Sequence, residues 1–403
     1  MPVLRKFNIN ETQETFMRRY RHSAAVAVAI ILSGASAAAL AEDTPAKAAM
    51  TKFDELLDSA GLTVSGYVAA SYYASNGYPG NIHQFDVDHN TFQLDQAGLQ
   101  VAYQPKEGFG ALVDVIAGED AKILHQAESG NFNATSQFDV RQAWVQYATG
   151  NLTVMAGKFV TLAGAEVINP TLNTNFSRSI LFFDSEPLTH TGVRAAYALG
   201  EFTLTGGVNN GWNTTSTNYG SKTGEAGIAW APASKLFAVS VNAYFGKNEG
   251  YDAEKTLLDV VATYNVTSQL SLVLNFDWDQ QDDGLVDDAG GLHDASWNAA
   301  ALYVNYAIND QFRVSVRGEY LDDTDGFVTG AKQTLKEGTV TLGYAPVKNF
   351  ELRAEFRYDK SGSDTPSFYR TREAIAVGTP DSDNLSQFAL QAVYKFSAPP
   401  PAP

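Results

Sequence analysis

Apolar and polar residues alternate one by one over much of the chain, a pattern typical of β-strands with two different faces. The segment 348–361 shows it most plainly. One parity is apolar: Phe350, Leu352, Ala354, Phe356 and Tyr358. The other parity is charged: Glu351, Arg353, Glu355, Arg357 and Asp359. Because the apolar face carries aromatic rings at both ends and aliphatic groups between them, the pattern favours a strand that crosses a bilayer.

The same alternation predicts about sixteen strands, an even number, after residue 61. They are 62–73, 91–104, 109–118, 138–149, 151–160, 191–199, 201–210, 224–231, 235–246, 255–266, 268–279, 296–308, 310–321, 334–345, 348–360 and 385–396. Most have the roughly 9–11 residues that a tilted strand needs to cross a membrane. The weaker segments at 138–160 and 201–231 leave fourteen or eighteen strands open.

Connections between these strands alternate between short turns and long loops. The long ones are 74–90, 119–137, 161–190, 211–223, 247–254, 280–295, 322–333 and 361–384. Such asymmetry is typical of outer-membrane barrels, which have short periplasmic turns and long outer loops. We therefore predict an all-β fold: a closed, antiparallel, up-and-down transmembrane barrel over 62–396, since closure leaves no unpaired strand edge in lipid.

The amino terminus has the features of a secretory signal peptide. A basic segment at 17–21 precedes the apolar, small-residue run 24–40, and Ala39-Leu40-Ala41 fits a cleavage site, so we predict removal of residues 1–41. Met17 is the expected start, and a retained signal anchor is the alternative. Residues 42–61 are expected to form a short periplasmic helical lead, and 397–403 a Pro-rich tail.

Composition narrows the function classes. The chain has no Cys and a formal net charge of -17, which excludes disulfides and Cys metal sites and argues against nucleic acid as a partner. Phosphate-binding Gly loops are also absent from the sequence, so we expect no cofactor. The acidic stretch 279–284 lacks calcium-loop spacing, and solvated outer loops bridged to lipopolysaccharide by divalent cations are expected instead.

Several segments in order resemble the OmpL-like β-barrel porin-2 family. They are G-Y-V-A-A-S-Y at 66–72, N-T-F-Q-L-D-Q-A at 90–97, A-G-E-D-A at 117–121, A-G-K-F-V-T-L-A-G-A-E-V at 156–167, N-F-S-R-S-I-L-F at 175–182, H-T-G-V-R at 190–194 and N-G-W at 210–212. The resemblance implies a pore for small solutes in the outer membrane of a Gram-negative bacterium. The family tends to end on an aromatic residue, whereas this chain continues beyond Phe396 to Pro403.

The long loop 161–190 lies within the strongest resemblance, which implies that it folds inward and narrows the barrel. Its charged candidates for a constriction are Glu166, Arg178, Asp184 and Glu186. The alternative is a surface loop that covers a neighbouring subunit.

Inward parity predicts a set of charged residues on the lumen wall: Arg194, Arg313, Arg317, Glu319, Arg353, Glu355 and Arg357. A lipid-facing Arg would cost roughly 2–4 kcal/mol, so these side chains should face water inside. They would set the field that a passing ion feels, or form salt bridges that fill the lumen. Arg141 and Lys158 conflict with their neighbours' parity, and a β-bulge could turn either inward.

These features predict a non-enzymatic porin for passive diffusion of small hydrophilic solutes and ions. Inward strand charges are nearly balanced and the loops are acidic, so we expect weak cation preference that fades with salt. The lipid-facing strands are compatible with either a monomer or a homotrimer. The alternatives are a non-conducting adhesin or structural barrel, and a rim hydrolase that uses His293 and Asp294.

Overall fold

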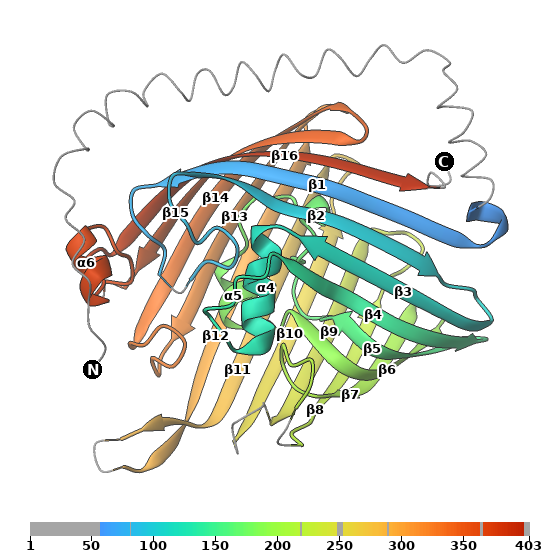
Figure 1. Ribbon diagram of the computed structural model, residues 1–403, viewed down its shortest axis with the longest axis horizontal. Coiled ribbons are helices and arrows are strands. Elements are labelled where there is room, and N and C mark those ends of the chain that lie inside the picture. Colours follow the sequence, from blue (N-terminus) through green and yellow to red (C-terminus); the bar gives the residue numbers. More distant parts are fainter. Residues whose placement is uncertain are drawn as a thin grey trace. The chain divides into compact units, whose positions relative to one another are not determined.

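A computed structural model describes residues 57–80, 82–217, 220–247, 253–287, 290–362 and 366–398. Sixteen antiparallel strands close into one barrel, and each strand pairs with its neighbours along the chain (Figure 1). β1 and β16 close the ring in a continuous register from Val64 opposite Ala398 to Ser75 opposite Gln387. The predicted fold class and the count of sixteen strands are confirmed.

Each observed strand falls on a predicted segment, with ends that differ by a few residues. The strands are β1 Leu62–Ser75, β2 Thr91–Tyr103, β3 Gly108–Ala117, β4 Phe138–Thr149, β5 Leu152–Val160, β6 Thr189–Leu199, β7 Phe202–Asn209, β8 Thr223–Trp230, β9 Phe237–Lys247, β10 Glu254–Asn265, β11 Leu270–Val286, β12 Leu292–Ala307, β13 Phe312–Asp323, β14 Gln333–Val347, β15 Phe350–Ser361 and β16 Asn384–Ala398. Short helical segments lie in three of the long loops: α4 Glu119–Ser129, η2 Pro170–Leu172, α5 Ile180–Asp184 and α6 Arg372–Val377.

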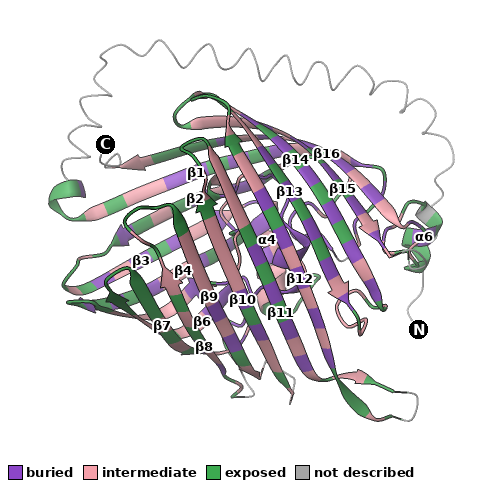
Figure 2. Ribbon diagram, turned by 180° about the vertical axis from the view of Figure 1, so that it is seen from behind, coloured by how far each residue is buried: buried purple, intermediate pink, exposed green. Residues whose placement is uncertain are grey.

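Alternation of buried and exposed residues runs along the strands, as Figure 2 shows by colour. On β15, Phe356 and Tyr358 are exposed while Arg353, Glu355 and Arg357 are buried. The apolar parity therefore faces outward and the charged parity inward, as a barrel with a lipid-covered exterior requires.

Aromatic rings mark the short-turn end of the outer face. Phe237 stacks on Tyr264 with centroids 4.5 Å apart, and Phe312 stacks on Tyr344 at 4.6 Å. Trp278, Tyr320 and Tyr358 are exposed nearer the long-loop ends of β11, β13 and β15. Two aromatic levels with aliphatic residues between them match the two interfaces of a bilayer. None of the helices in the described ranges is long and apolar enough to cross a membrane.

Two connections differ from the sequence prediction. The expected acidic loop 280–295 is largely strand, because β11 and β12 keep pairing beyond the bilayer as far as Val286 and Leu292. Low strand propensity of its Asp and Gly residues is outweighed by the hydrogen bonds of that hairpin. β16 also extends to Ala398, into the expected tail. The predicted signal peptide, most of the helical lead and residues 399–403 lie outside the described residues.

Candidate functional site

Loop 161–190 connects β5 to β6, yet its backbone is bound by inward side chains of strands far along the chain. The backbone N–H of Leu162 donates to the hydroxyl of Tyr244 on β9 at 2.9 Å. The N–H groups of Phe176 and Ser177 donate to the carboxylate of Glu355 on β15 at 2.6 and 2.9 Å. The loop therefore contacts the wall at both β9 and β15, and Figure 1 shows α5 within the ring of strands.

The short helix α5 is oriented by carboxylates at its amino end. Ser179 caps the helix by accepting a hydrogen bond from the N–H of Phe182, and Ser179 donates its own N–H to Glu166 at 2.6 Å. The N–H of Ile180 donates to Glu319 on β13 at 2.7 Å. The first N–H groups of a helix have no acceptor within the helix. Here the carboxylates of Glu166 in the loop and Glu319 in the wall are the acceptors.

Arg317 on β13 is fully buried and contacts both the wall and the loop. Its guanidinium lies 2.8 Å from Glu166 of the loop, 2.9 Å from Glu319 and 3.2 Å from Glu337 of β14. It also donates to the carbonyl of Ser177 at 2.9 Å. This residue joins the predicted constriction residue Glu166 to the predicted wall residue Glu319.

The two arginines of β15 bind carbonyl oxygens of the same loop. Arg353 donates to the carbonyl of Pro170 at 3.0 Å, and Arg357 donates to that of Arg178 at 2.6 Å. Arg178 in turn donates to the carbonyl of Ile168 at 3.0 Å, within the loop. Guanidinium groups carry several donors in a fixed plane, so each can satisfy backbone and carboxylate acceptors together.

The remaining predicted wall residues also have acidic partners. Arg194 on β6 pairs with Glu225 on β8 at 2.6 Å. Arg313 and Arg353 share Glu351, with distances of 2.6 and 2.8 Å. The structure thus brings most of the predicted wall and loop residues into one network, while Arg194 lies apart from it.

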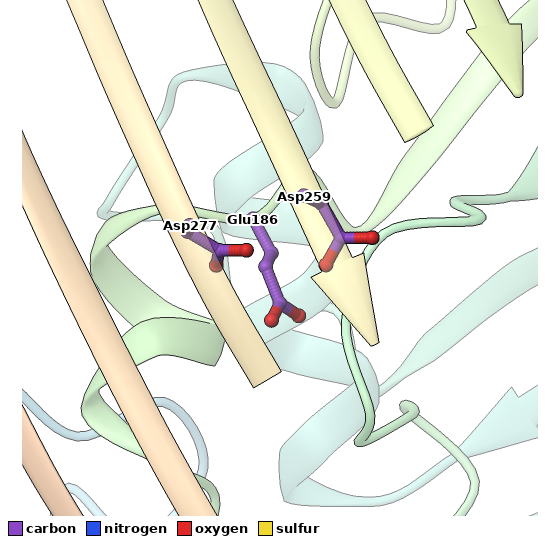
Figure 3. Close-up of side chains that lie close together, drawn as sticks. All are labelled: Glu186, Asp259 and Asp277. Carbon is purple, nitrogen blue, oxygen red and sulfur yellow. The ribbon is translucent and has the colours of Figure 1, made fainter. Parts of the chain in front are cut away.

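Asp184 and Glu186, at the end of α5, face a different part of the wall. They lie close to Asp259 on β10 and to Asp277 and Asp279 on β11. Burial, with neighbouring carboxylates, raises the pKa of Glu186 well above its ordinary value. Burial also raises the pKa of Asp184, and the positive charge of nearby Lys255 offsets part of that increase. Figure 3 shows Glu186 between Asp259 and Asp277.

Sequence reasoning missed that the loop 76–90 also folds inward. His83 is buried, with its ring nitrogens 2.8 Å from Asp86 and 3.2 Å from Asp359 of β15. Gln387 of β16 donates to Asp86 at 2.6 Å. No sequence signal distinguished this His from one in a solvated loop, since Asp359 is remote along the chain.

Besides Asp359, which is already on the charged parity of 348–361, parity could have identified further inward acids, namely Glu225, Asp259, Asp277 and Glu337. With them, buried acidic side chains outnumber buried basic ones. The expected near balance of inward strand charges is therefore wrong, because the predicted wall set included only two acids, Glu319 and Glu355, and buried acids outnumber buried bases.

The uncertain parity of Arg141 is explained by a bulge in β4. Asp114 of β3 pairs with Gln142 and Val115 pairs with Val140, which leaves Arg141 as the extra residue. Arg141 is buried and donates to Asp114 at 2.6 Å. Lys158 also faces acids, lying 2.8 Å from Asp139.

Two cavities of the barrel differ in size. A space of about 10 Å³ lies between the two inward loops and β2, lined by Asp95, Pro170, Phe176 and Arg178 among others. Near the short turns of β10–β13, a pocket of about 250 Å³ is lined by Asn305, Arg313 and Ser315 among others. The pocket beside the two inward loops is thus much smaller than the pocket near the short turns.

His293, the candidate residue for a rim hydrolase, contacts a different acid from the predicted Asp294. His293 lies 2.9 Å from Asp287, while Asp294 accepts a hydrogen bond from the N–H of Asp283. Both residues of the His293–Asp287 pair are well exposed on the outer hairpin.

Comparison with solved structures finds outer-membrane channels of similar fold. The DcaP channel of Acinetobacter baumannii aligns with a TM-score of 0.59 at 14% identity, covering 84% of this chain and 98% of that one. OprB of Pseudomonas putida aligns with a TM-score of 0.57 at 13% identity, covering 85% of this chain and 96% of that one. An anion-selective porin from Comamonas acidovorans aligns with a TM-score of 0.56 at 12% identity, covering 83% of this chain and 99% of that one.

Comparison with curated proteins finds no match. The family described as "Putative beta-barrel porin-2, OmpL-like" matches residues 61–396, which include all but the last two residues of the barrel strands. This match and the closed barrel of sixteen strands locate the protein in the outer membrane of a Gram-negative bacterium. The chain belongs to the OmpL-like β-barrel porin-2 family.

Proposed function

We propose that this protein is a porin through which small hydrophilic solutes and ions diffuse passively, and that loop 161–190 narrows the passage. The observation that carries the proposal is the loop's backbone, whose N–H groups bind Tyr244, Glu319 and Glu355 across the barrel. A segment held in this way reduces the cross-section of a barrel of this size, which would otherwise contain a wide channel.

The charge network supports a rigid constriction with a mild preference for cations. Arginines at the loop are paired with acids, so their positive charge is largely cancelled at short range. Acids in excess of bases remain on the inward faces. A passing cation would therefore meet a weakly attractive field, and dissolved salt would screen the acidic outer loops.

The test combines planar-bilayer recording with liposome swelling in sugars of graded size. A variant in which residues 170–184 are replaced by a short Gly-Ser linker should show larger single-channel steps and admit larger sugars. The matched control shortens the outer β11–β12 hairpin beyond Asp283 and should leave both properties unchanged. Silence from well-folded wild-type protein would instead support a non-conducting adhesin or structural barrel.

We also propose a homotrimer and no catalytic activity. A trimeric form of a similar barrel, OmpT of Vibrio cholerae, aligns with a TM-score of 0.55 at 12% identity, covering 83% of this chain and 99% of that one. Cross-linking of the detergent-extracted protein tests the trimer. Replacement of His293 by Ala tests catalysis, since conductance should persist and no hydrolytic activity should be lost.

A further inference from the structure

Three buried carboxylates from separate segments meet inside the barrel. Glu186 follows α5 in loop 161–190, Asp259 lies on β10 and Asp277 lies on β11, and one oxygen of each lies within 4.8 Å of the others. Asp259 and Asp277 are direct cross-strand partners. Like charges in that position destabilise a sheet, so this arrangement needs either a compensating positive charge or protons shared among the carboxylates.

Two carboxylate oxygens of the cluster accept no hydrogen bond from the described residues. In the described parts of the chain, Oε2 of Glu186 and Oδ2 of Asp277 have no hydrogen-bond partner, although both side chains are more than nine-tenths buried. Figure 3 shows the Glu186 carboxylate directed between the other two. Buried acceptors without donors are costly, and an ionised carboxylate is more costly than a neutral group.

Arginine does not supply the missing charge. The guanidinium groups of β13 and β15 are engaged by Glu166, Glu337, Glu351 and Asp359. Lys255 on β10 is a further basic group in this region, and its Nζ lies 4.0 Å from Asp279 and 3.7 Å from the ring centre of Trp212. Lys255 is therefore occupied by a fourth carboxylate and an indole ring.

We propose that Glu186, Asp259 and Asp277 bind one calcium ion, which fastens loop 161–190 to β10 and β11. Calcium prefers carboxylate oxygens at about 2.3–2.6 Å, so two ligands on opposite sides of the ion lie roughly 5 Å apart. The observed oxygen separations fall within that span. A buried group of three acids also favours a divalent ion over a monovalent one.

Amide groups around the cluster hold two of the ligands in place. Asn275 donates to both Asp259 and Asp277 at 3.1 Å, and Asn242 donates to Asp259 at 2.9 Å. The N–H of Gly164, in the same loop, donates to Asp259 at 3.0 Å. Partners of this kind orient metal ligands, and they leave one oxygen of Glu186 and one of Asp277 without a hydrogen-bond partner in the described ranges.

The first experiment measures calcium binding to the full, detergent-folded protein by calorimetry with CaCl₂ after removal of EDTA. The wild type should show one saturable site. Glu186→Gln and Asp277→Asn should each raise the dissociation constant at least tenfold. The matched control, Asp282→Asn with Asp283→Asn on the outer hairpin, should keep the wild-type value, because it removes acids that lie away from the cluster.

Thermal unfolding in CaCl₂ and in EDTA gives a second readout. Calcium should raise the apparent Tm of the wild type and leave that of Glu186→Gln unchanged. In EDTA the variant should equal or exceed the wild type, because it removes a negative charge that is repelled by the neighbouring carboxylates.

Two results would overturn the site. Equal calcium affinity of the wild type and Glu186→Gln would assign the binding to outer acids. Well-folded wild type that binds no calcium would mean that the three carboxylates share protons instead. The inference depends on the docking of loop 161–190 and not on conduction, so a barrel that binds calcium but passes no current would refute only the proposed function.

Discussion

At the scale of single residues, the packing of the barrel interior depends on charged side chains that are buried as ion pairs. Arg317 is fully buried and contacts Glu166, Glu319 and Glu337. Removing one member of such a group leaves the others without compensation, which costs more than the intact group contributes. The arginines of this lumen are therefore structural as well as electrostatic.

Replacement of Arg317 by Met should lower the free energy of unfolding by about 3–5 kcal/mol, because buried acids lose their partner. It should also release part of loop 161–190 and raise single-channel conductance. Urea unfolding in detergent and bilayer recording measure the two effects. Lys106→Met, in an exposed short turn, should change stability by less than about 0.5 kcal/mol.

A second variant separates charge from packing. Adding Glu337→Gln to Arg317→Met neutralises one of the stranded acids, so it should restore part of the lost stability. If the double variant is no more stable than Arg317→Met, the cost arises from the lost volume of the Arg side chain and not from unpaired charge.

His83 should make the stability of the inward loop 76–90 depend on pH. Burial lowers the pKa of His83 and Arg357 also lowers it, but Asp86 and Asp359 outweigh both, so the pKa lies above its ordinary 6.5. The protonated ring thus contributes stability that is complete below pH 6.5 and is lost as the pH rises through the raised pKa.

Unfolding measured between pH 5 and 9 tests this prediction. His83→Gln should cost about 1.5–3 kcal/mol at low pH, as expected for hydrogen bonds to charged groups, and progressively less at high pH. His293→Gln, on the exposed outer hairpin, is the control and should leave the wild-type pH profile intact. A cost for His83→Gln that is constant with pH would contradict the predicted protonation.

At the scale of the strand, the type of residue on the outer face changes with its depth in the bilayer. Leu302 on β12 pairs with Leu274 of β11, midway between the Trp278 and Tyr306 levels of this hairpin. Both leucines are exposed on the outer face. Such a position should lie near the middle of the hydrocarbon layer.

Leu302→Arg should therefore destabilise the barrel by about 2–4 kcal/mol in lipid vesicles. Leu292→Arg places the same residue on the same strand, but on the outer hairpin, and should cost about 0–1 kcal/mol. Unfolding by guanidinium in vesicles measures both. Equal costs at the two positions would show that the hydrophobic band does not lie where the aromatic rings place it.

At the scale of the whole molecule, charge selection is a property of side chains and not of the barrel. The anion-selective porin from Comamonas acidovorans has a similar fold at 12% identity. In this chain, acids outnumber bases among the buried polar residues, and the net charge is -17. This excess of acids is the basis for the ion selectivity that we predict for this chain.

In a KCl gradient at low salt, with EDTA present, the reversal potential should have the sign of weak cation selectivity. The preference should fade toward 1 M KCl, where the Debye length falls to about 3 Å. Planar-bilayer recording checks both statements. A reversal potential of the anionic sign would mean that the excess of inward acids does not set the field in the passage.

Much of the fold could be predicted because its determinants are local. A strand that separates lipid from water must alternate with a period of two, so each strand carries its own evidence in sequence. Even the Asp259–Asp277 pair was within reach, since a hairpin with its turn near residue 268 places these residues opposite each other. The bulge at Arg141 was predicted only as an option, because an inserted residue changes the parity of its neighbours.

By itself, the sequence determined the class of fold, the strands, and which face of each meets lipid, because these follow from neighbours along the chain. Only the tertiary structure decided which inward charges meet. Glu166 and Arg317 are 151 residues apart, and His83 and Asp359 are 276 apart. Such contacts depend on barrel closure and on the path of two inward loops, and no local pattern encodes either.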